Sequence, residues 1–403
     1  MTGLSAGTPH GRAARIPEDL LDRVRGWRHA LHRIPETAFE EHRTSKYAAD
    51  VLRELGFDVA TGIGGTGVVG SLTRGSSTRA VGLRAELDAL PLAEQSEVAH
   101  VSRHPGRMHA CGHDGHLAMV LGAAAALTDD DDLDGTVRIV LQPAEEPGRG
   151  ARAMVEDGLF RRFPVDSLYA LHNLPGIPAG RFGTRPGAIM ASEDDFVIEI
   201  GGRGGHASAP HLLVDPLVVA AEIVLALQHV VSRNVDPLDT AVVSCTDLRT
   251  DGARNAVPSH AWITGDTRSF DPGVQALLAR RIDEISRGVA AAHGARATVT
   301  YSHEFIPTVN DDGCVVVAGQ AATTALGADR VDLDAAPVMA SEDFAVLAQQ
   351  VPACLGFLGN GSGDGPGAVP LHSHDYDFND EVLPDGVAYL RQVVRDSLPG
   401  LWA

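Results

Sequence analysis

The segment Met108–His116, MHACGHDGH, gathers three histidines, one cysteine and one aspartate within nine residues. Thiolate, imidazole and carboxylate groups together suit zinc or a neighbouring first-row transition ion. Cys111 and His113 are two residues apart, so in an extended chain their side chains point the same way. A zinc finger would also need a second cysteine pair, which this sequence lacks. Further ligands must therefore come from distant parts of the chain.

A second group of reactive side chains is the adjacent pair Glu145 and Glu146 in LQPAEE, which follows the apolar strand sequence TVRIVLQ. Adjacent strand residues point to opposite faces, so just past a strand end one carboxylate can bind a metal while the other faces a substrate. A solvated acidic pair is the alternative interpretation. However, an unpaired carboxylate after a buried run is unfavourable, and a metal would offset that cost for one of them.

These residues need elements that bring them together, and the sequence predicts strands ending beside each of them. Strands and helices alternate along the first part of the chain, which favours a mostly parallel sheet covered on both faces. Ligands of such sheets lie outside the carboxyl ends of the strands. The reactive residues predicted at such ends are Glu86, Asp88, Glu145, Glu146 and His172, with His372 after a glycine-rich loop.

The order of predicted elements changes near residue 191, where the pattern β-α-β-β-α-β begins. This is the split pattern of a ferredoxin-like module. We therefore expect an α/β protein with a catalytic domain at 17–190 and 304–403 and an inserted ferredoxin-like domain at 191–303.

The composition excludes some classes of partner. A formal net charge of −20 argues against nucleic acid and anionic membranes. The four cysteines are scattered, so structural disulfides are not expected. The N-terminus lacks the apolar segment of a signal peptide. The apolar run PLVVAAEIVLALQHVV contains Glu222 and is predicted to be too short to span a bilayer. We expect a cytoplasmic protein.

Several ordered motifs resemble one family of enzymes. MHACGHDGH, LQPAEE, ALHNLP, GGHASAPH, MASEDF and LHSHDY occur here in this order. The chain resembles the metal-dependent amidohydrolases that include hippurate hydrolase, N-acyl-amino-acid amidohydrolases and plant auxin-conjugate hydrolases, within the wider aminoacylase and carboxypeptidase group of two-metal enzymes. The resemblance runs from about residue 20 to about residue 395. It implies hydrolysis of the amide bond of N-acyl amino acids.

The resemblance also implies roles for individual residues. Glu145 is expected as the general base, and Cys111 as the bridging ligand where related peptidases place an aspartate. The cofactors expected are two divalent ions per subunit, zinc, manganese, cobalt or nickel. The expected metal ligands are Cys111, His113, Glu146, His172 and His372.

The inserted domain resembles the family's lid and dimerisation domain, which implies a homodimer with a small-molecule substrate. His206 is expected to reach the substrate carbonyl, in related enzymes across the dimer. Asn255 and Arg268 resemble substrate-contact and lid positions.

Two residues depart from the family pattern. Glu86 stands where the family usually has aspartate, although Asp88 is kept, so a contact behind the ligands could shift and tune the choice of metal. His374 stands where the family usually has proline. It is expected to face solvent, with a contact to substrate or metal as the alternative.

Four other interpretations compete with the amidohydrolase. A dipeptidase or carboxypeptidase could use the same metals. A cysteine hydrolase could use Cys111 as nucleophile beside a histidine base. A non-catalytic binding protein would be expected to lack a ligand or the base, and neither is missing. A closed structural zinc site would not need Glu145 beside it.

Overall fold

The computed structural model describes residues 16–365 and 367–398. The chain forms two compact units, here called unit 1 and unit 2. Within the described residues, unit 1 runs to Gly187 and resumes with Asn310–Ala335 and from Val346 onward. Unit 2 comprises Ala188–Val309 and Ala336–Ala345.

The second part of unit 2 differs from the expected domain boundaries. Residues 304–403 were expected to belong to the catalytic domain, but Ala336–Ala345 belongs to unit 2. Backbone hydrogen bonds explain this, because the Ala191 N–H donates to the carbonyls of Val338 and Ala340 at 3.2 and 3.0 Å. Such pairing with a distant segment leaves no periodic signal in the sequence.

Unit 1 is built on a sheet of eight strands in the order β1-β2-β4-β3-β5-β16-β6-β15. Its strands are β1 (Asp58–Ile63), β2 (Gly67–Arg74), β3 (Ala80–Glu86), β4 (Gly135–Gln142), β5 (Ser167–Pro175), β6 (Phe182–Gly183), β15 (Val331–Asp332) and β16 (Ala353–Gly361). The adjacent strands β4, β3, β5 and β16 are parallel. The pairs β1-β2, β2-β4 and β16-β6 are antiparallel.

The sheet is therefore mixed: four of its seven strand pairs are parallel, β15-β6 among them, and the three antiparallel pairs depart from the predicted parallel pattern. A turn of only a few residues, containing Gly64 and Gly65, joins β1 to β2, and a connection that short permits only antiparallel pairing. In the centre, every residue of β3 and β16 is buried, as expected for parallel strands covered on both faces.

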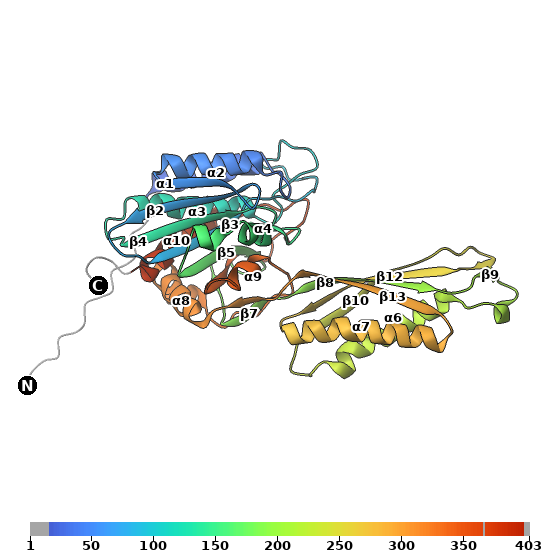
Figure 1. Ribbon diagram of the computed structural model, residues 1–403. Helices are drawn as coiled ribbons and strands as arrows, with labels where there is room; N and C mark the ends of the chain where they lie inside the picture. Colours follow the sequence, from blue (N-terminus) through green and yellow to red (C-terminus); the bar gives the residue numbers. More distant parts are fainter. Residues whose placement is uncertain (1–15, 366, 399–403) are drawn as a thin grey trace, which may run out of the picture. The chain divides into compact units, whose positions relative to one another are not determined.

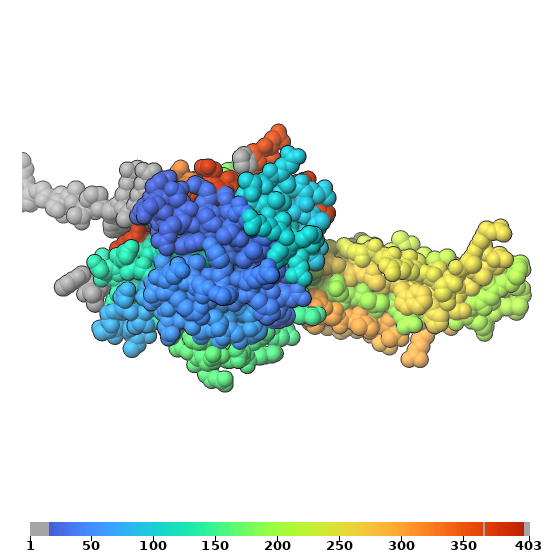
Figure 2. Space-filling view, turned by 90° about the horizontal axis from the view of Figure 1, so that it is seen from above, coloured from blue at the N-terminus to red at the C-terminus, as the bar shows by residue number. Residues whose placement is uncertain are grey.

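Helices cover the sheet of unit 1 (Figure 1). They are α1 (Glu18–His32), α2 (His42–Glu54), α3 (His113–Thr128), α4 (Gly150–Glu156), α5 (Leu159–Arg162), α8 (Asp312–Leu326), α10 (Leu383–Ser397) and, at the unit boundary, α9 (Phe344–Ala348). Helix α3 packs on β3 and contacts both α1 and α10. From above, blue N-terminal residues and the cyan segment before α3 cover much of the visible face of unit 1 (Figure 2).

Helix α3 begins within the motif MHACGHDGH and lies in the core of unit 1. Almost all of its residues are buried, because its sequence has no polar face after His116. Gly112 occupies the N-cap position with φ 91°, while the Asp114 carboxylate bonds to Arg28 and His32 of α1.

Unit 2 contains a four-stranded antiparallel sheet in the order β10-β12-β8-β13. Its main elements are, in chain order, β8 (Glu193–Gly201), α6 (Pro216–Asn234), β10 (Ala241–Thr250), β12 (His260–Ser269), α7 (Pro272–Ala292) and β13 (Arg296–Phe305). Shorter strands are β7 (Gly187–Met190), β9 (Gly205–His206), β11 (Ala256–Val257) and β14 (Thr308–Asn310). Asp215 and Asp271 cap the two helices, each of which begins with a proline. The order of the main elements is β-α-β-β-α-β.

Helix α6 is long and apolar enough to cross a membrane by length and composition, with 19 residues and a mean hydropathy of 1.4. The prediction that this run is too short was therefore wrong as to length. The same helix packs on the sheet of unit 2 through Val219, Ile223 and Leu227, as the core helix of a folded domain does.

Candidate metal centre

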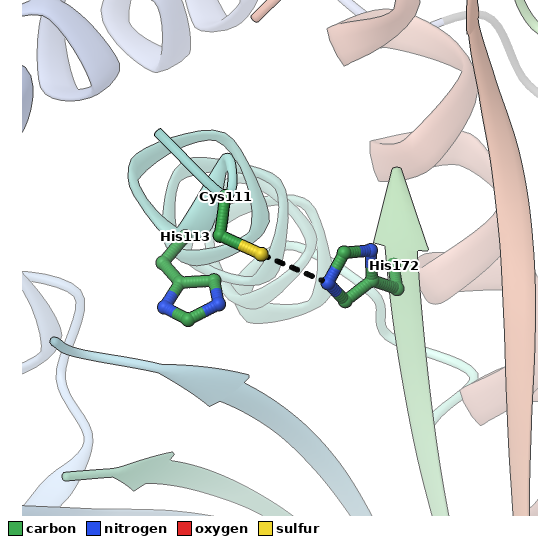
Figure 3. Close-up of side chains that lie close together, drawn as sticks. All are labelled: Cys111, His113 and His172. Carbon is green, nitrogen blue, oxygen red and sulfur yellow. Dashed lines mark hydrogen bonds between the residues drawn. The ribbon is translucent and has the colours of Figure 1, made fainter. Parts of the chain in front are cut away.

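Three buried side chains from two elements meet at one end of the sheet of unit 1 (Figure 3). His113 is the first residue of α3, Cys111 lies two residues before it, and His172 lies on β5. The Cys111 Sγ and His172 Nε2 atoms are 3.6 Å apart. Candidate ligand atoms of all three side chains lie within 4.8 Å of one another. Two segments about sixty residues apart therefore present sulfur and nitrogen to the same point.

The acidic pair and the last histidine extend this group. Glu146 and His372 approach at 3.5 Å between Oε2 and Nε2, and both belong with Cys111 to a second group of candidate ligands. Glu145 and Glu146 lie 3.8 and 4.0 Å from the His113 Nε2 atom. The structure thus brings together all five residues predicted as ligands, as well as the predicted base.

The donor atoms of the histidines fit a metal. The His113 Nδ1–H donates to the Asp88 carbonyl at 2.9 Å, and the His172 Nδ1–H donates to the Asn173 carbonyl at 2.7 Å. In both rings the Nε2 lone pair therefore points into the group. The His113 Nε2 atom is buried and, within the described residues, has no hydrogen bond. A divalent cation would satisfy that buried atom.

The sharing of Cys111 suits two cations rather than one. Cys111 belongs to one group with His113 and His172 and to another with Glu146 and His372. Metal–sulfur and metal–nitrogen bonds of about 2.0–2.3 Å allow two ligand atoms of one ion to lie up to about 4.5 Å apart. Both groups meet this limit approximately, so the residues present fit a dinuclear site with a bridging thiolate.

Without a cation, burial favours the neutral forms of Cys111 and His172. Burial raises the pKa of the Cys111 thiol to about 12, and the nearby Glu146 carboxylate adds to this. Burial and the neighbouring His116 hold the pKa of His172 well below its usual value. An uncharged thiol is a poor nucleophile, which disfavours a cysteine hydrolase. A bound cation would instead displace the thiol proton.

Asp88 and Glu86 support the ligands from behind. The Asp88 carboxylate accepts the Glu146 N–H at 3.0 Å, so it holds the backbone of the acidic pair. Glu86 is buried, contacts Arg84 and bonds His116 Nδ1 at 2.8 Å. Burial would raise the pKa of Glu86, but the Arg84 cation and the neighbouring His116 hold it well below its usual value.

His116 is a site residue that the sequence analysis did not assign. Its Nδ1 atom bonds Glu86, and its Nε2 atom lies 2.7 Å from the Asn173 amide oxygen. With both nitrogens occupied it is a supporting residue, although it also lies near His113 and Glu86 in a third group of candidate ligands. Its spacing of three residues from His113 on one helix could have indicated this.

His374 lies apart from the candidate ligand groups of the described residues. Its ring is exposed, and its Nδ1–H donates to the Ala93 carbonyl at 2.6 Å. His374 therefore faces solvent, and its hydrogen bond holds the segment that precedes α3.

The three residues predicted to contact substrate lie in unit 2, but not together. His206 and Asn255 are exposed neighbours on β9 and just before β11, where the Ala207 N–H donates to the Asn255 carbonyl at 3.1 Å. Arg268 lies at the opposite end of the four-stranded sheet, paired with Glu193 at 2.9 Å. About nine residues of β8 separate these positions, or roughly 30 Å of strand. Within unit 2 alone they do not form one site.

A buried ionic cluster holds α1 against the start of α3. The His32 ring bonds Asp114 at 2.8 Å through Nδ1 and Glu94 at 3.2 Å through Nε2. Arg28 pairs with the same Asp114 carboxylate at 3.3 Å. Burial alone would lower the pKa of His32, but the two carboxylates outweigh it and raise the pKa to about 9. His32 is therefore cationic at neutral pH.

This cluster predicts a loss of stability at alkaline pH. Because the folded-state pKa of His32 lies above its unfolded value, its contribution is complete below about pH 6.5 and disappears as pH rises through about 9. The loss should reach about 3 kcal/mol. Urea unfolding of the metal-free protein between pH 6.5 and 9 measures it. His32→Gln should flatten this decline, whereas His211→Gln, at an exposed histidine, should not. Equal slopes in wild type and His32→Gln would contradict the assignment.

Comparison with known proteins identifies the family of this chain. The model of peptidase family M20/M25/M40 matches residues 82–396. The hippurate hydrolase of Campylobacter jejuni is 39% identical over 376 residues, covering 93% of this chain and 97% of that protein. The IAA-amino acid hydrolase ILR1-like 5 of Arabidopsis thaliana is 38% identical, covering 93% and 86%.

A solved structure agrees with these relatives. The YXEP protein of Bacillus subtilis, described as a dinuclear metal binding peptidase of the M20 family, has a TM-score of 0.81 and 28% identity, covering 94% of this chain and 98% of that chain. The resemblance inferred from the motifs is confirmed. This chain belongs to peptidase family M20/M25/M40 and is an amidohydrolase of that family.

Proposed function

We propose that this enzyme hydrolyses the amide bond of N-acyl amino acids and releases a carboxylic acid and a free amino acid. One observation carries the proposal: five side chains that could bind metal and a further buried carboxylate, Glu145, converge in unit 1. The similarity to a hippurate hydrolase and to an IAA-amino acid hydrolase supports this class of substrate.

Two divalent cations, of zinc, manganese, cobalt or nickel, would complete the site. Cys111, His113, Glu146, His172 and His372 would hold them, and Cys111, which belongs to both groups of candidate ligands, would be the bridging ligand. When bound, such cations lower the pKa of water and polarise an amide carbonyl. The positions of Asp88, Glu86 and His116 support roles in fixing the ligands.

Glu145 is the proposed general base. Its carboxylate would take a proton from the attacking water and pass it to the leaving nitrogen, which otherwise departs as a poor amide anion. Its place beside His113 and its burial support this role. Glu146, the next residue, is the proposed metal ligand of the acidic pair.

Unit 2 is proposed as the lid, with His206 stabilising the oxyanion and Asn255 and Arg268 contacting substrate. The exposure of His206 supports this, since a residue that reaches another site must be free to do so. Arg268 would have to leave Glu193 and Asp266 to bind a carboxylate. His206→Ala should lower kcat and leave the metal content unchanged, and normal kinetics would remove His206 from the mechanism.

A homodimer through unit 2 is also proposed. The strand β10 lies at an edge of its sheet, and α6 exposes Leu217, Val218 and Leu225 on its outer side. An open strand edge and an apolar helix face both favour association with a second copy. Sedimentation velocity would test this, and a monomer at micromolar concentration would contradict it. A cytoplasmic location stays a prediction.

A substrate panel tests the proposed activity. The metal-free enzyme would be reloaded with manganese, zinc, cobalt or nickel and given N-acetyl, N-benzoyl and longer N-acyl amino acids, together with dipeptides. Release of the free amino acid is expected from acylated substrates and should stop when metal is removed. Cleavage of dipeptides alone would indicate a dipeptidase. No release with any metal would indicate a binding protein.

A further inference from the structure

The backbone beside the acidic pair adopts an unusual conformation. Among the described residues, Phe39, Ala144 and His372 are the residues other than glycine with positive φ, at 61°, 48° and 62°. A side chain with a Cβ atom disfavours this left-handed region by roughly 1–2 kcal/mol. Such residues persist where the surroundings hold them, and they concentrate at functional sites. Ala144 immediately precedes Glu145.

A single carboxylate binds two of these strained residues. The Glu41 Oε1 atom accepts the N–H groups of both Phe39 and Ala144, each at 2.9 Å. Its other oxygen accepts the Thr66 hydroxyl. Glu41 is fully buried, and none of the ion pairs found among the described residues includes it. A buried carboxylate without a cation is unfavourable unless hydrogen bonds compensate it. In this protein the compensating hydrogen bonds also hold the backbone conformations of Phe39 and Ala144.

The turn that Ala144 opens is tightly closed. The Ala144 carbonyl accepts the N–H groups of Arg149 and Gly150 at 3.2 and 2.9 Å. A Cβ atom on Gly150 would lie 1.5 Å from the Pro143 carbonyl oxygen, so only glycine fits there. Glu145 and Glu146 occupy this turn, and their side-chain directions follow from its backbone.

Two carboxylates hold the backbone of the turn, one just before the acidic pair and one within it. Glu41 binds the N–H of Ala144, one residue before the pair, and Asp88 binds the N–H of Glu146 at 3.0 Å. Asp88 also supports His113 through its backbone carbonyl. Glu41 has no contact of that kind with a candidate ligand, and its connection to the site passes through Ala144.

We infer that Glu41 is a positioning residue, which orients Glu145 and Glu146 by holding Ala144 in the left-handed conformation. The inference rests on the proposed function, because Glu145 and Glu146 act there as base and ligand. Without Glu41, the Cβ atom of Ala144 would drive this residue out of the left-handed region, and the acidic pair would move. Glycine at position 144 has no such preference.

The test compares Glu41→Ala, Ala144→Gly and the double variant. Glu41→Ala should lower kcat about 10²-fold, as expected for misplaced reacting groups, with a smaller change in KM. Ala144→Gly alone should stay near wild type. In the double variant, glycine should restore about 10-fold of the lost kcat, since it adopts the turn without help. A general loss of packing would not be repaired by removing a methyl group from a distant turn.

Two matched variants separate positioning from burial. Glu41→Gln keeps an oxygen for both N–H groups and should retain kcat within about 3-fold. Thr66→Val removes a bond to the same carboxylate but leaves Ala144 bound, and it should also keep kcat. If Glu41→Ala does not fold, Glu41→Asp replaces it, since the shorter side chain keeps the charge but withdraws the oxygen from Ala144.

Cobalt affinity, measured by calorimetry, gives a readout that does not depend on turnover. Glu41→Ala should weaken cobalt binding through Glu146, and Ala144→Gly should restore part of it. Wild-type kcat and cobalt affinity in Glu41→Ala, or an equal loss in Thr66→Val, would overturn the inference. If wild type itself hydrolyses no substrate of the panel, the proposed function fails, and the cobalt measurements alone decide the role of Glu41.

Discussion

Replacing Glu145 with glutamine should lower kcat by about 10²–10⁴-fold while the metal content stays at the wild-type level. Glutamine has nearly the same size, so the turn and the ligands should keep their places. It cannot accept a proton from water, so both the attack and the protonation of the leaving nitrogen would slow. Steady-state kinetics at saturating substrate and elemental analysis of the purified variant measure the two quantities.

The neighbouring residue provides the control for this experiment. Glu146→Gln changes the same charge one residue away, but it removes a proposed ligand, so it should lose metal as well as activity. If Glu145→Gln retained wild-type kcat, Glu145 would be excluded as the base. If it lost metal instead, the two glutamates would have the opposite roles.

Removing the sulfur of Cys111 should abolish activity through loss of metal. Cys111 is the residue common to the groups that contain His172 and His372, so its removal affects both proposed ions. Substitution of a residue that hydrogen-bonds to a metal ligand typically weakens metal binding by about 10–100-fold. Cys111→Ala removes a proposed ligand itself, so it should weaken metal binding by more than this. Calorimetric titration with zinc or cobalt would measure this.

Cys111→Asp distinguishes a ligand from a nucleophile. Aspartate can bridge two cations, as related peptidases are expected to do, so this variant should bind metal and keep part of its activity. A covalent mechanism through sulfur would leave no activity in Cys111→Asp. Cys245→Ala, at a half-buried thiol of unit 2, serves as the control and should match wild type.

The sequence predicted the candidate site better than the sheet that carries it. The ligands follow strands or precede a helix, and this local signal was sufficient to group Cys111, Glu146 and His172. The strands β6 and β15 have two residues each, too short for any alternation of apolar and polar side chains. The antiparallel pairing of β6 with β16, and the pairing of β15 with β6 at the sheet edge, therefore could not be predicted.

The residues that the sequence analysis did not assign act through tertiary contacts. His116 is fixed by Glu86 and Asn173, and Glu41 reaches Ala144 across about a hundred positions of the chain. Aspartate is a common helix-capping residue, but the Asp114 carboxylate bonds instead to a histidine and an arginine of α1. Propensity rules weigh near neighbours, so partners this distant override them.

The division of the chain between the two units has a consequence for biosynthesis. The strands and helices of unit 2 from β8 to β13 form one continuous stretch, which leaves the ribosome before β16, His372 and α10 exist. Domains generally fold as units during translation, so the inserted unit should be native while its host still lacks a central strand. Metallation must then wait for the end of synthesis, and nascent chains halted before His372 should carry a folded insert yet capture no stable cation pair.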